Sequence, residues 1–302
     1  MLAITPGDCA AAQLRAADLA EDVLPWRDLL HEGPVPAGLD PVGLARVRAE
    51  FVSAQGWADP AEAAATFAER DATLAEAAAK PAEIVLWFDT NLVNRLALLQ
   101  VLDRLAELRP GLDEVTLAEP VSFGGATAGQ LTQLATHRRP ISTDRLTRAR
   151  GAWAAFRAAD PTRLVEYTVD QGPLGAALRI HLQQFPHVGD GLAGTERRAL
   201  AAVAAGAREF PDVYRAVTAA DAPPWLGDSV LRSHLDRLAT AAHPLVARDA
   251  AGGWRITPDG SAVLSGRADH VARNGIDRWL GGVHLTGGNV WRFDPDPARL
   301  VR

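Results

Sequence analysis

A short segment near the N-terminus gathers side chains that can hold an anion and move a proton. Within seven residues it carries an indole, a guanidinium, two carboxylates and an imidazole, on Trp26, Arg27, Asp28, His31 and Glu32. A guanidinium suits bidentate hydrogen bonding to a carboxylate or phosphate, and an imidazole suits proton transfer near neutral pH. We therefore predict that Trp26 and Arg27 bind an anionic ligand and that Asp28, His31 and Glu32 are catalytic. A purely structural ion pair between Arg27 and Asp8 or Asp28 is the alternative.

Asp8 and Cys9 lie where a short apolar run gives way to a helical pattern. The free N–H groups and the positive dipole end of a helix favour negative charge at that point. Asp8 is predicted to contact the ligand, with a helix N-cap as its alternative role. Cys9 is predicted as a nucleophile with His31 as its base, because a helix N-terminus lowers the pKa of a thiol. A small residue at a tight turn is the alternative for Cys9.

Asp89 and Asn91 follow a third apolar run, Glu83 to Phe88, and are predicted to bind the same ligand. With Asp8, His31 and Glu32, Asp89 could also surround a Mg²⁺ or Mn²⁺ ion. The chain has no spaced metal-ligand signature, so no metal site is predicted. It has neither a G-x-G-x-x-G nor a G-x-x-x-x-G-K-[ST] motif, so no cofactor is assigned.

The elements that must position these residues alternate between strand and helix. Apolar runs predict strands over 2–5, 23–28, 83–88 and 113–118, and helical periodicity predicts helices over 9–19, 41–55, 60–79, 92–108 and 127–136. This alternation predicts an α/β fold, a mainly parallel sheet with flanking helices, for an α/β ligand-binding domain over 1–141. The loops that carry Asp8, Asp28 and Asp89 should then meet at the carboxyl edge of the sheet.

The remaining chain is predicted to be a helical connector over 142–190 and a winged helix-turn-helix-like domain over 191–302. Three helical patterns, over 195–206, 209–219 and 227–238, precede a hairpin signal over 245–257. A Gly- and Trp-rich stretch, 279–293, is predicted to form a terminal hairpin. Exposed arginines of the third helix and the wing would contact DNA, and the candidates are Arg232, Arg237 and Arg248.

Charge makes DNA the second choice of partner. The net charge of −6 divides into −8 up to residue 190, from 17 basic and 25 acidic residues, and +2 beyond it, from 14 basic and 12 acidic residues. A DNA-binding surface usually carries more positive charge than this. A structural or protein-contacting winged helix is therefore the alternative.

Composition restricts the cellular location that is expected for the protein. The 302 residues are 48% apolar and include one cysteine, which excludes an intrachain disulfide and favours a reducing, cytoplasmic location. No run of about 18 apolar residues occurs, and the N-terminus lacks a basic signal region, so neither a membrane span nor export is expected. A homo-oligomer is compatible with the sequence.

Four motifs resemble those of the bacterial family catalogued as domain of unknown function 1835. They are Gly7-Asp8-Cys9-Ala10-Ala11, Trp26 to Val35, Leu86-Trp87-Phe88-Asp89, and Asp277-Arg278-Trp279-Leu280-Gly281-Gly282-Val283-His284-Leu285. The resemblance covers both parts of the chain and implies a fold and a site position but no activity. Cys9 stands where the family usually has serine, and Asn91 stands where it has aspartate, which weakens a carboxylate-pair or metal role at that position.

Three functions from different classes follow from these patterns. In the first, the protein binds a small anionic metabolite, such as a nucleotide or phosphorylated compound, and as an enzyme would also transform it. The second is a one-component transcriptional regulator with an α/β sensor and a DNA-binding winged helix. The third is an interaction protein without catalysis.

Overall fold

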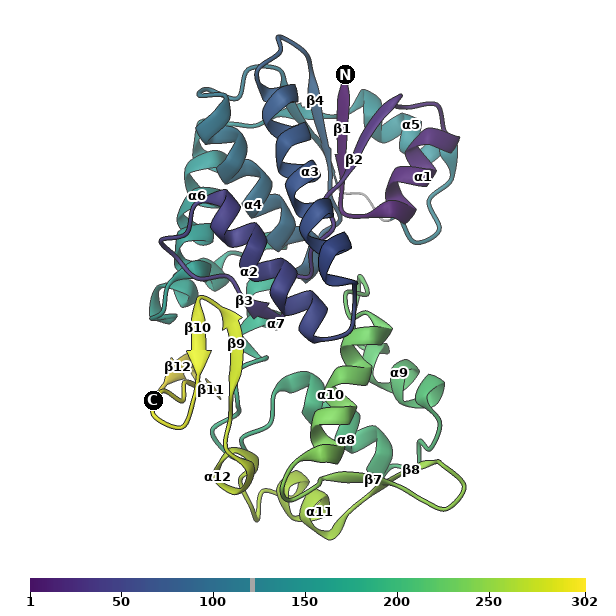
Figure 1. Ribbon diagram of the computed structural model, residues 1–302, viewed down its shortest axis with the longest axis vertical. Coiled ribbons are helices and arrows are strands. Elements are labelled where there is room, and N and C mark those ends of the chain that lie inside the picture. Colours follow the sequence, from purple (N-terminus) through teal and green to yellow (C-terminus); the bar gives the residue numbers. More distant parts are fainter. Residues whose placement is uncertain (120–122) are drawn as a thin grey trace. The chain divides into compact units, whose positions relative to one another are not determined.

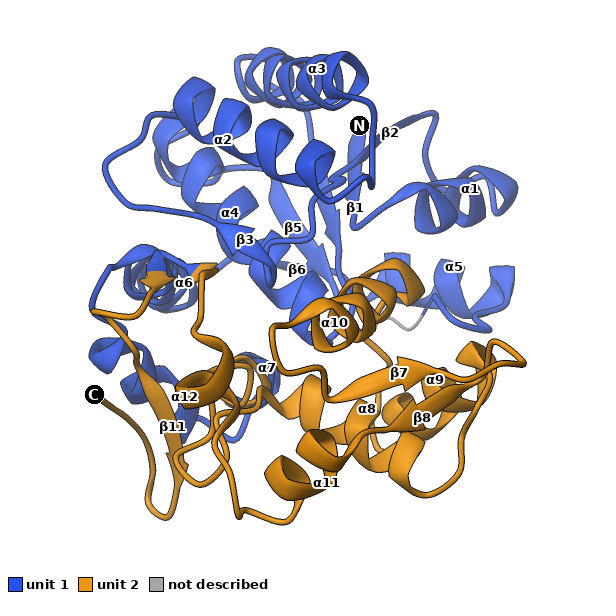
Figure 2. Ribbon diagram, turned by 60° about the horizontal axis from the view of Figure 1, so that its bottom comes forward, with its two compact units in different colours: residues 1–177, 281–283 blue, residues 178–280, 284–302 orange. Residues whose placement is uncertain are grey.

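The chain folds into two compact units (Figure 2). The computed structural model describes residues 1–119 and 123–302. Unit 1 comprises Met1–Ala177 with Gly281–Val283, and unit 2 comprises Leu178–Leu280 with His284–Arg302. The segment 142–190, predicted as a connector, is divided between the two units.

Unit 1 is built on a five-stranded sheet of order β2-β1-β4-β5-β6. The first four of these strands are parallel and β6 is antiparallel, which confirms the predicted, mainly parallel α/β sheet. Ile4 lies beside both Leu24 and Leu86 in the register. The strands of unit 1 are β1 (Leu2–Thr5), β2 (Asp22–Pro25), β3 (Gly33–Pro34), β4 (Ile84–Trp87), β5 (Val115–Ala118) and β6 (Arg139–Pro140).

Helices cover both faces of this sheet (Figure 1). One face, with Ala3, Val85 and Trp87, packs against Leu14 and Leu131 of helices α1 and α5. The other face lies against the layer that contains α2, α3, α4 and α6. The helices that begin in unit 1 are α1 (Asp8–Ala16), α2 (Pro41–Ala54), α3 (Pro60–Ala78), α4 (Leu92–Leu108), α5 (Ala128–Thr136), α6 (Thr143–Arg157), the 3-10 helix η1 (Thr162–Val169) and α7 (Pro173–Leu182).

Local capping explains where several of these helices begin. Asp59 accepts hydrogen bonds from the N–H groups of Ala61 and Glu62, and Pro60 occupies the first turn. Thr127 forms a capping box with Gln130 at the start of α5. The predicted starts at Pro41, Pro60 and Leu92 agree with the structure.

Within unit 2, three consecutive helices precede a two-stranded antiparallel hairpin. Helix α8 contacts α9, α10, β8 and α11, around buried side chains that include Leu200, Val213, Leu231 and Trp254. Its elements are α8 (Gly194–Ala204), α9 (Phe210–Thr218), α10 (Asp228–Thr240), β7 (Val246–Arg248), β8 (Trp254–Ile256), α11 (Pro258–Leu264), α12 (His270–Asn274), β11 (Arg292–Pro295) and β12 (Ala298–Val301). The strands β9 (Arg278–Gly281) and β10 (Val283–Leu285) also lie in unit 2, except for Gly281 and Val283, which belong to unit 1. β9 and β10, at the start of the predicted 279–293, are hydrogen-bonded neighbours, and a second, antiparallel pair is formed by β11 and β12.

The glycine pair Gly281-Gly282 belongs to unit 1 because its backbone packs against the backbone that ends α6. Gly282 N donates to the carbonyl oxygen of Phe156 (2.9 Å), and Val35 N donates to the carbonyl oxygen of Gly281 (2.7 Å). Gly281 has φ +60°. A Cβ atom at Gly282 would overlap the carbonyl oxygen of Arg157. Only glycine fits this approach without a shift of the backbone.

Candidate functional site

Four parallel strands end at one edge of the sheet, so the residues that follow them share that edge. Asp8 follows β1, Arg27 follows β2, Asp89 follows β4 and Glu119 follows β5. The chain passes from β1 outward to β2 on one side and from β4 outward to β5 on the other. The switch point, where ligands bind in open α/β sheets, therefore lies between β1 and β4.

Asp8 and Arg27 form an ion pair at this edge. Arg27 Nε donates to Asp8 Oδ2 (2.8 Å) and Arg27 Nη2 donates to Asp8 Oδ1 (2.5 Å). The side chains are 66% and 50% exposed, respectively, so both are accessible to a ligand. The hydrogen bond from Arg27 lowers the pKa of Asp8, and the same bond raises the pKa of Arg27. This is one of the structural pairs that the sequence left as an alternative.

The start of α1 has no side-chain cap. Gly7 is the N-cap residue, and Asp8 is the first residue of the helix rather than its cap. A Cβ at Gly7 would meet nothing within 4 Å, so the space around this residue is open. Cys9 is exposed in the same turn. Because Gly7 has no side chain, the N–H groups of this turn donate no hydrogen bond to a side chain at the N-cap position.

Asp28 lies in a buried charge network rather than on the surface. Arg48 Nη2 donates to Asp28 Oδ1 (2.7 Å), and Arg70 Nη1 lies 3.9 Å from Asp28 Oδ2. Arg48 also donates to the carbonyl oxygens of Glu32 (2.7 Å) and Leu29 (3.1 Å). The side chain of Asp28 is 0% exposed and that of Arg48 is 1% exposed. These contacts hold the loop after β2 in one conformation.

Other predicted residues of this loop are also buried. Trp26 Nε1 donates to Gln100 Oε1 (2.8 Å), and the guanidinium of Arg70 lies 4.1 Å from the centre of the Trp26 ring. His31 and Glu32 are 1% and 4% exposed. The structure therefore separates the predicted cluster into an accessible pair, Asp8 and Arg27, and a set of buried side chains.

Sequence reasoning missed Arg48 and Arg70, although the sequence carries a signal for both. Arg48 lies between Leu44 and Val52 on the buried stripe of α2. Arg70 lies between Phe67 and Leu74 on the buried stripe of α3. An arginine within an apolar stripe indicates a buried charge that requires a carboxylate partner.

The residues after β4 are held by the start of α4. Asn91 caps this helix, because its Oδ1 accepts from Asn94 N (3.0 Å). Asp89 Oδ1 accepts from Thr90 N (2.5 Å). The buried Arg95 donates to the carbonyl oxygen of Asp89 (2.8 Å) and to Glu119 Oε2 (3.0 Å). Burial lowers the pKa of Arg95, although the neighbouring Glu119 acts against this.

The predicted acids do not converge on a cation site. Across residues 1–119 and 123–302, no group of three or more His, Cys, Asp or Glu side chains is placed to hold a metal ion. Asp8 is bonded to Arg27, and Asp89 is bonded to the backbone of Thr90. The described residues therefore provide no such cluster for the Mg²⁺ or Mn²⁺ alternative at Asp8, His31, Glu32 and Asp89.

No protein-family model matches the chain, and no curated protein matches it significantly. The resemblance to the domain of unknown function 1835 family therefore stays a prediction. In the described part of the chain, no helix is long and apolar enough to span a bilayer.

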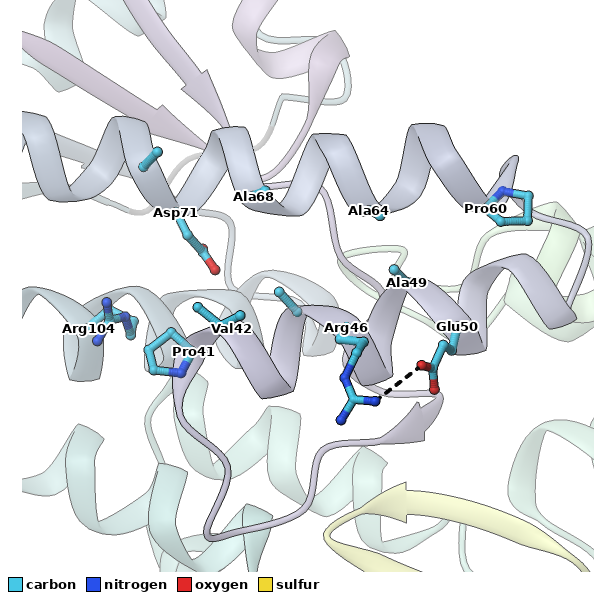
Figure 3. Close-up of a pocket in the computed structure, with 12 residues that line it drawn as sticks. Pro41, Val42, Arg46, Ala49, Glu50, Pro60, Ala64, Ala68, Asp71 and Arg104 are labelled. Atoms are coloured by element: carbon cyan, nitrogen blue, oxygen red, sulfur yellow. Dashed lines mark ion pairs between the residues drawn. The ribbon is translucent and has the colours of Figure 1, made fainter.

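Two concave regions of unit 1, a groove and a cavity, are lined by none of the predicted site residues. A groove of about 680 Å³ runs between α2 and α3 (Figure 3), and small apolar side chains such as Ala49, Ala64 and Ala68 line it. A cavity of about 460 Å³ is lined by leucines and by charged side chains that include Arg95, Glu119, Arg145 and Arg148. Arg95 and Arg145 both pair with Glu119, and Arg148 pairs with Asp170, so these charges are paired with one another.

The three candidate DNA contacts differ in environment. Arg232 is exposed on α10, with its guanidinium 3.6 Å from the centre of the Phe210 ring. Arg248 is exposed on β7 and lies 3.6 Å from the centre of the Trp254 ring. Arg237 is half-buried, with Nη2 3.0 Å from His234 Nδ1, and it lines a cavity within unit 2.

Proposed function

We propose that unit 1 binds a small anionic metabolite, a nucleotide or another phosphorylated compound, at the carboxyl edge of its sheet. The observation that carries the proposal is the accessible guanidinium of Arg27 beside the uncapped first turn of α1. Guanidinium and helix N–H groups together are the donors that proteins use for oxyanions. The nearby switch point between β1 and β4 supports the same location.

The bond between Asp8 and Arg27 gives the site a mechanism of exchange. An incoming oxyanion competes with the Asp8 carboxylate for the same two guanidinium N–H groups. The Asp8 carboxylate therefore occupies the position on Arg27 that the oxyanion of the ligand would take. We assign Asp28, through Arg48 and Arg70, to holding the loop that presents Arg27. Cys9, exposed next to Asp8, is the accessible nucleophile if the ligand is also transformed.

The first prediction concerns this exchange. Arg27→Ala should weaken binding of inorganic phosphate or adenosine monophosphate by about 10- to 100-fold, because it removes a charged hydrogen-bond donor. Asp8→Asn should strengthen binding, because it removes the competing negative charge. Isothermal titration calorimetry on the purified chain measures both, after small molecules that co-purify are identified by mass spectrometry and removed.

Arg46→Ala is the matched control for this experiment. Arg46 is 71% exposed and pairs weakly with Glu50 at 3.8 Å on α2. Its removal should leave anion affinity unchanged. Equal affinities of the wild-type and Arg27→Ala proteins would overturn the proposal, and opposite changes in Arg27→Ala and Asp8→Asn would support it.

A second candidate function rests on the element order of unit 2. Helices α8, α9 and α10 followed by the β7–β8 hairpin match the order of a winged helix-turn-helix. On this proposal α10 would read the major groove and the hairpin would be the wing. The exposed Arg232 and Arg248 would then contact phosphates, and the protein would be a one-component regulator.

The second prediction tests DNA binding. If the second candidate is correct, the double variant Arg232→Ala/Arg248→Ala should bind duplex DNA more weakly. The slope of its log K against log salt concentration should also be less steep by about two. Fluorescence polarisation over genomic fragments at several salt concentrations measures this. Arg215→Ala, which removes a 76% exposed arginine of α9, is the control. Absence of wild-type binding at low salt would exclude this function.

A further inference from the structure

Unit 2 contains a cavity with charged walls that the proposed function does not use. It has a volume of about 370 Å³, within the range of small-molecule sites. Its walls come from α8, α10, α12 and the segment 275–278 that leads into β9. Its polar lining residues are Glu196, Arg237, His270, Asn274, Asp277 and Arg278. Asp277 and Arg278 open the fourth motif of the sequence, whose function was otherwise unassigned.

Glu196 is the buried carboxylate of this cavity. Its Oε2 accepts from Ala193 N (3.0 Å). Its Oε1 lies 3.5 Å from His234 Nδ1 and 3.8 Å from Arg278 Nη1. Burial alone would raise the pKa of Glu196, but the hydrogen bond with His234 and the charges of Arg278 and Arg237 hold it well below its usual range. Glu196 is therefore ionised at neutral pH.

Two guanidinium groups face this single buried carboxylate. Arg278 is 11% exposed, and Arg237 Nη2 lies 3.0 Å from His234 Nδ1. The other acidic residue of the lining, Asp277, is 83% exposed and lies 2.7 Å from His284 Nε2. Water therefore screens the charge of Asp277. The lining of the cavity therefore combines two guanidinium groups, which can donate to an oxyanion, with one buried carboxylate.

Residues of α12 and two glycines complete the wall. Asn274 Nδ2 lies 3.1 Å from His270 Nδ1, and Asn274 Oδ1 accepts from His243 N (2.7 Å), which fixes this side chain in α12. Gly191 and Gly275, at φ +71° and +69°, form part of the lining. A Cβ atom at Gly191 would lie 2.8 Å from both Asp269 Oδ1 and Val271 N. The backbone at Gly191 therefore lies close to that of α12, whereas the space at Gly275 is open.

We propose that this cavity is a second ligand site, which binds a small metabolite through an oxyanion group, with Arg237 and Arg278 as the donors. Two fork-shaped guanidinium groups match the oxygen spacing of a carboxylate or a phosphate. Glu196 keeps the two arginines in place by its own charge. Arg237 thereby has a role inside unit 2 that differs from the DNA contact predicted from sequence.

The test uses the full chain and three probes: succinate, inorganic phosphate and adenosine monophosphate. Hydrogen exchange followed by mass spectrometry should show that at least one probe, at millimolar concentration and constant ionic strength, protects the segments 191–196 and 270–278. Protection by succinate alone identifies a carboxylate ligand, and protection by the phosphates alone identifies a phosphorylated one. If none of the probes protects these segments, the proposal is wrong.

Variants separate this site from the one in unit 1. Arg237→Gln should lower the affinity for the protecting probe at least tenfold and abolish the protection of 270–278 from exchange. Arg27→Ala should leave that protection intact. Arg232→Gln, on the same helix but exposed, is the matched control. If Arg237→Gln does not fold, Arg278→Gln replaces it as the variant that removes one of the two guanidinium donors. Unchanged affinity and protection in a folded Arg237→Gln protein would overturn the proposal.

Discussion

Arg48→Met is expected to destabilise unit 1 by about 3–5 kcal/mol, the usual cost of removing one partner of a buried ion pair. The Asp28 carboxylate would keep only Arg70, at 3.9 Å, and would stay fully buried. The carbonyl oxygens of Leu29 and Glu32 would each lose a donor. Urea denaturation measures the loss, and hydrogen exchange in β1 and β2 assigns it to unit 1.

Arg46→Met is the matched control on the same helix. Because Arg46 is exposed, its replacement should change the free energy of unfolding by no more than about 0.5 kcal/mol. The double variant Asp28→Asn/Arg48→Met should lose less free energy of unfolding than the two single variants lose in sum, because it leaves no uncompensated carboxylate. A loss below about 1 kcal/mol in Arg48→Met would show that the network does not stabilise the loop.

Gly282→Ala is expected to destabilise unit 1 by about 3 kcal/mol, at the upper end of the cost of overpacking. Its added methyl group would overlap the carbonyl oxygen of Arg157, which is backbone and cannot rotate away as a side chain would. The hydrogen bond from Gly282 N to the carbonyl oxygen of Phe156 would be strained in consequence. The midpoint of thermal unfolding, followed by circular dichroism, should fall.

Gly288→Ala is the control for this substitution. A Cβ atom at Gly288 would meet nothing within 4 Å. The same methyl group should therefore leave the midpoint nearly unchanged there. Equal midpoints for Gly282→Ala and the wild type would contradict the close backbone approach.

The sequence predicted the sheet and its helices well because their signals are local. The helix over 92–108 and the strand over 83–88 are each marked by an apolar pattern within the element itself. The aspartate-proline start at Asp59 is equally local. Pattern, cap and burial agree in these segments, and the structure follows them.

The candidate site could be predicted only in part, because burial depends on distant partners. Arg27 and Asp28 are adjacent, yet one is accessible and the other is buried. Neighbours along an extended segment point in opposite directions, but the sequence alone does not show which side is covered. The partners of Asp28 come from α2 and α3, 20 and 42 residues further along the chain.

The C-terminal glycines show the same limit at a longer range. The motif around Gly281-Gly282 was visible in the sequence, but its reason is a contact with Phe156 and Arg157 in another part of the chain. The prediction of a hairpin over 279–293 followed from the Gly- and Trp-rich composition and the strand-like ends. The structure pairs two short strands, β9 and β10, at the start of this stretch and forms a second pair, β11 and β12, over 292–301.

The return of Gly281–Val283 to unit 1 has a consequence for how the protein is made. During synthesis, Met1–Ala177 leaves the ribosome long before the three residues that complete its packing. Until then, Val35 N and the carbonyl oxygen of Phe156 lack the partners that these residues supply. Unit 1 can therefore finish folding only after nearly the whole of unit 2 has been translated, and a fragment cut after Ala177 would lack part of its own fold.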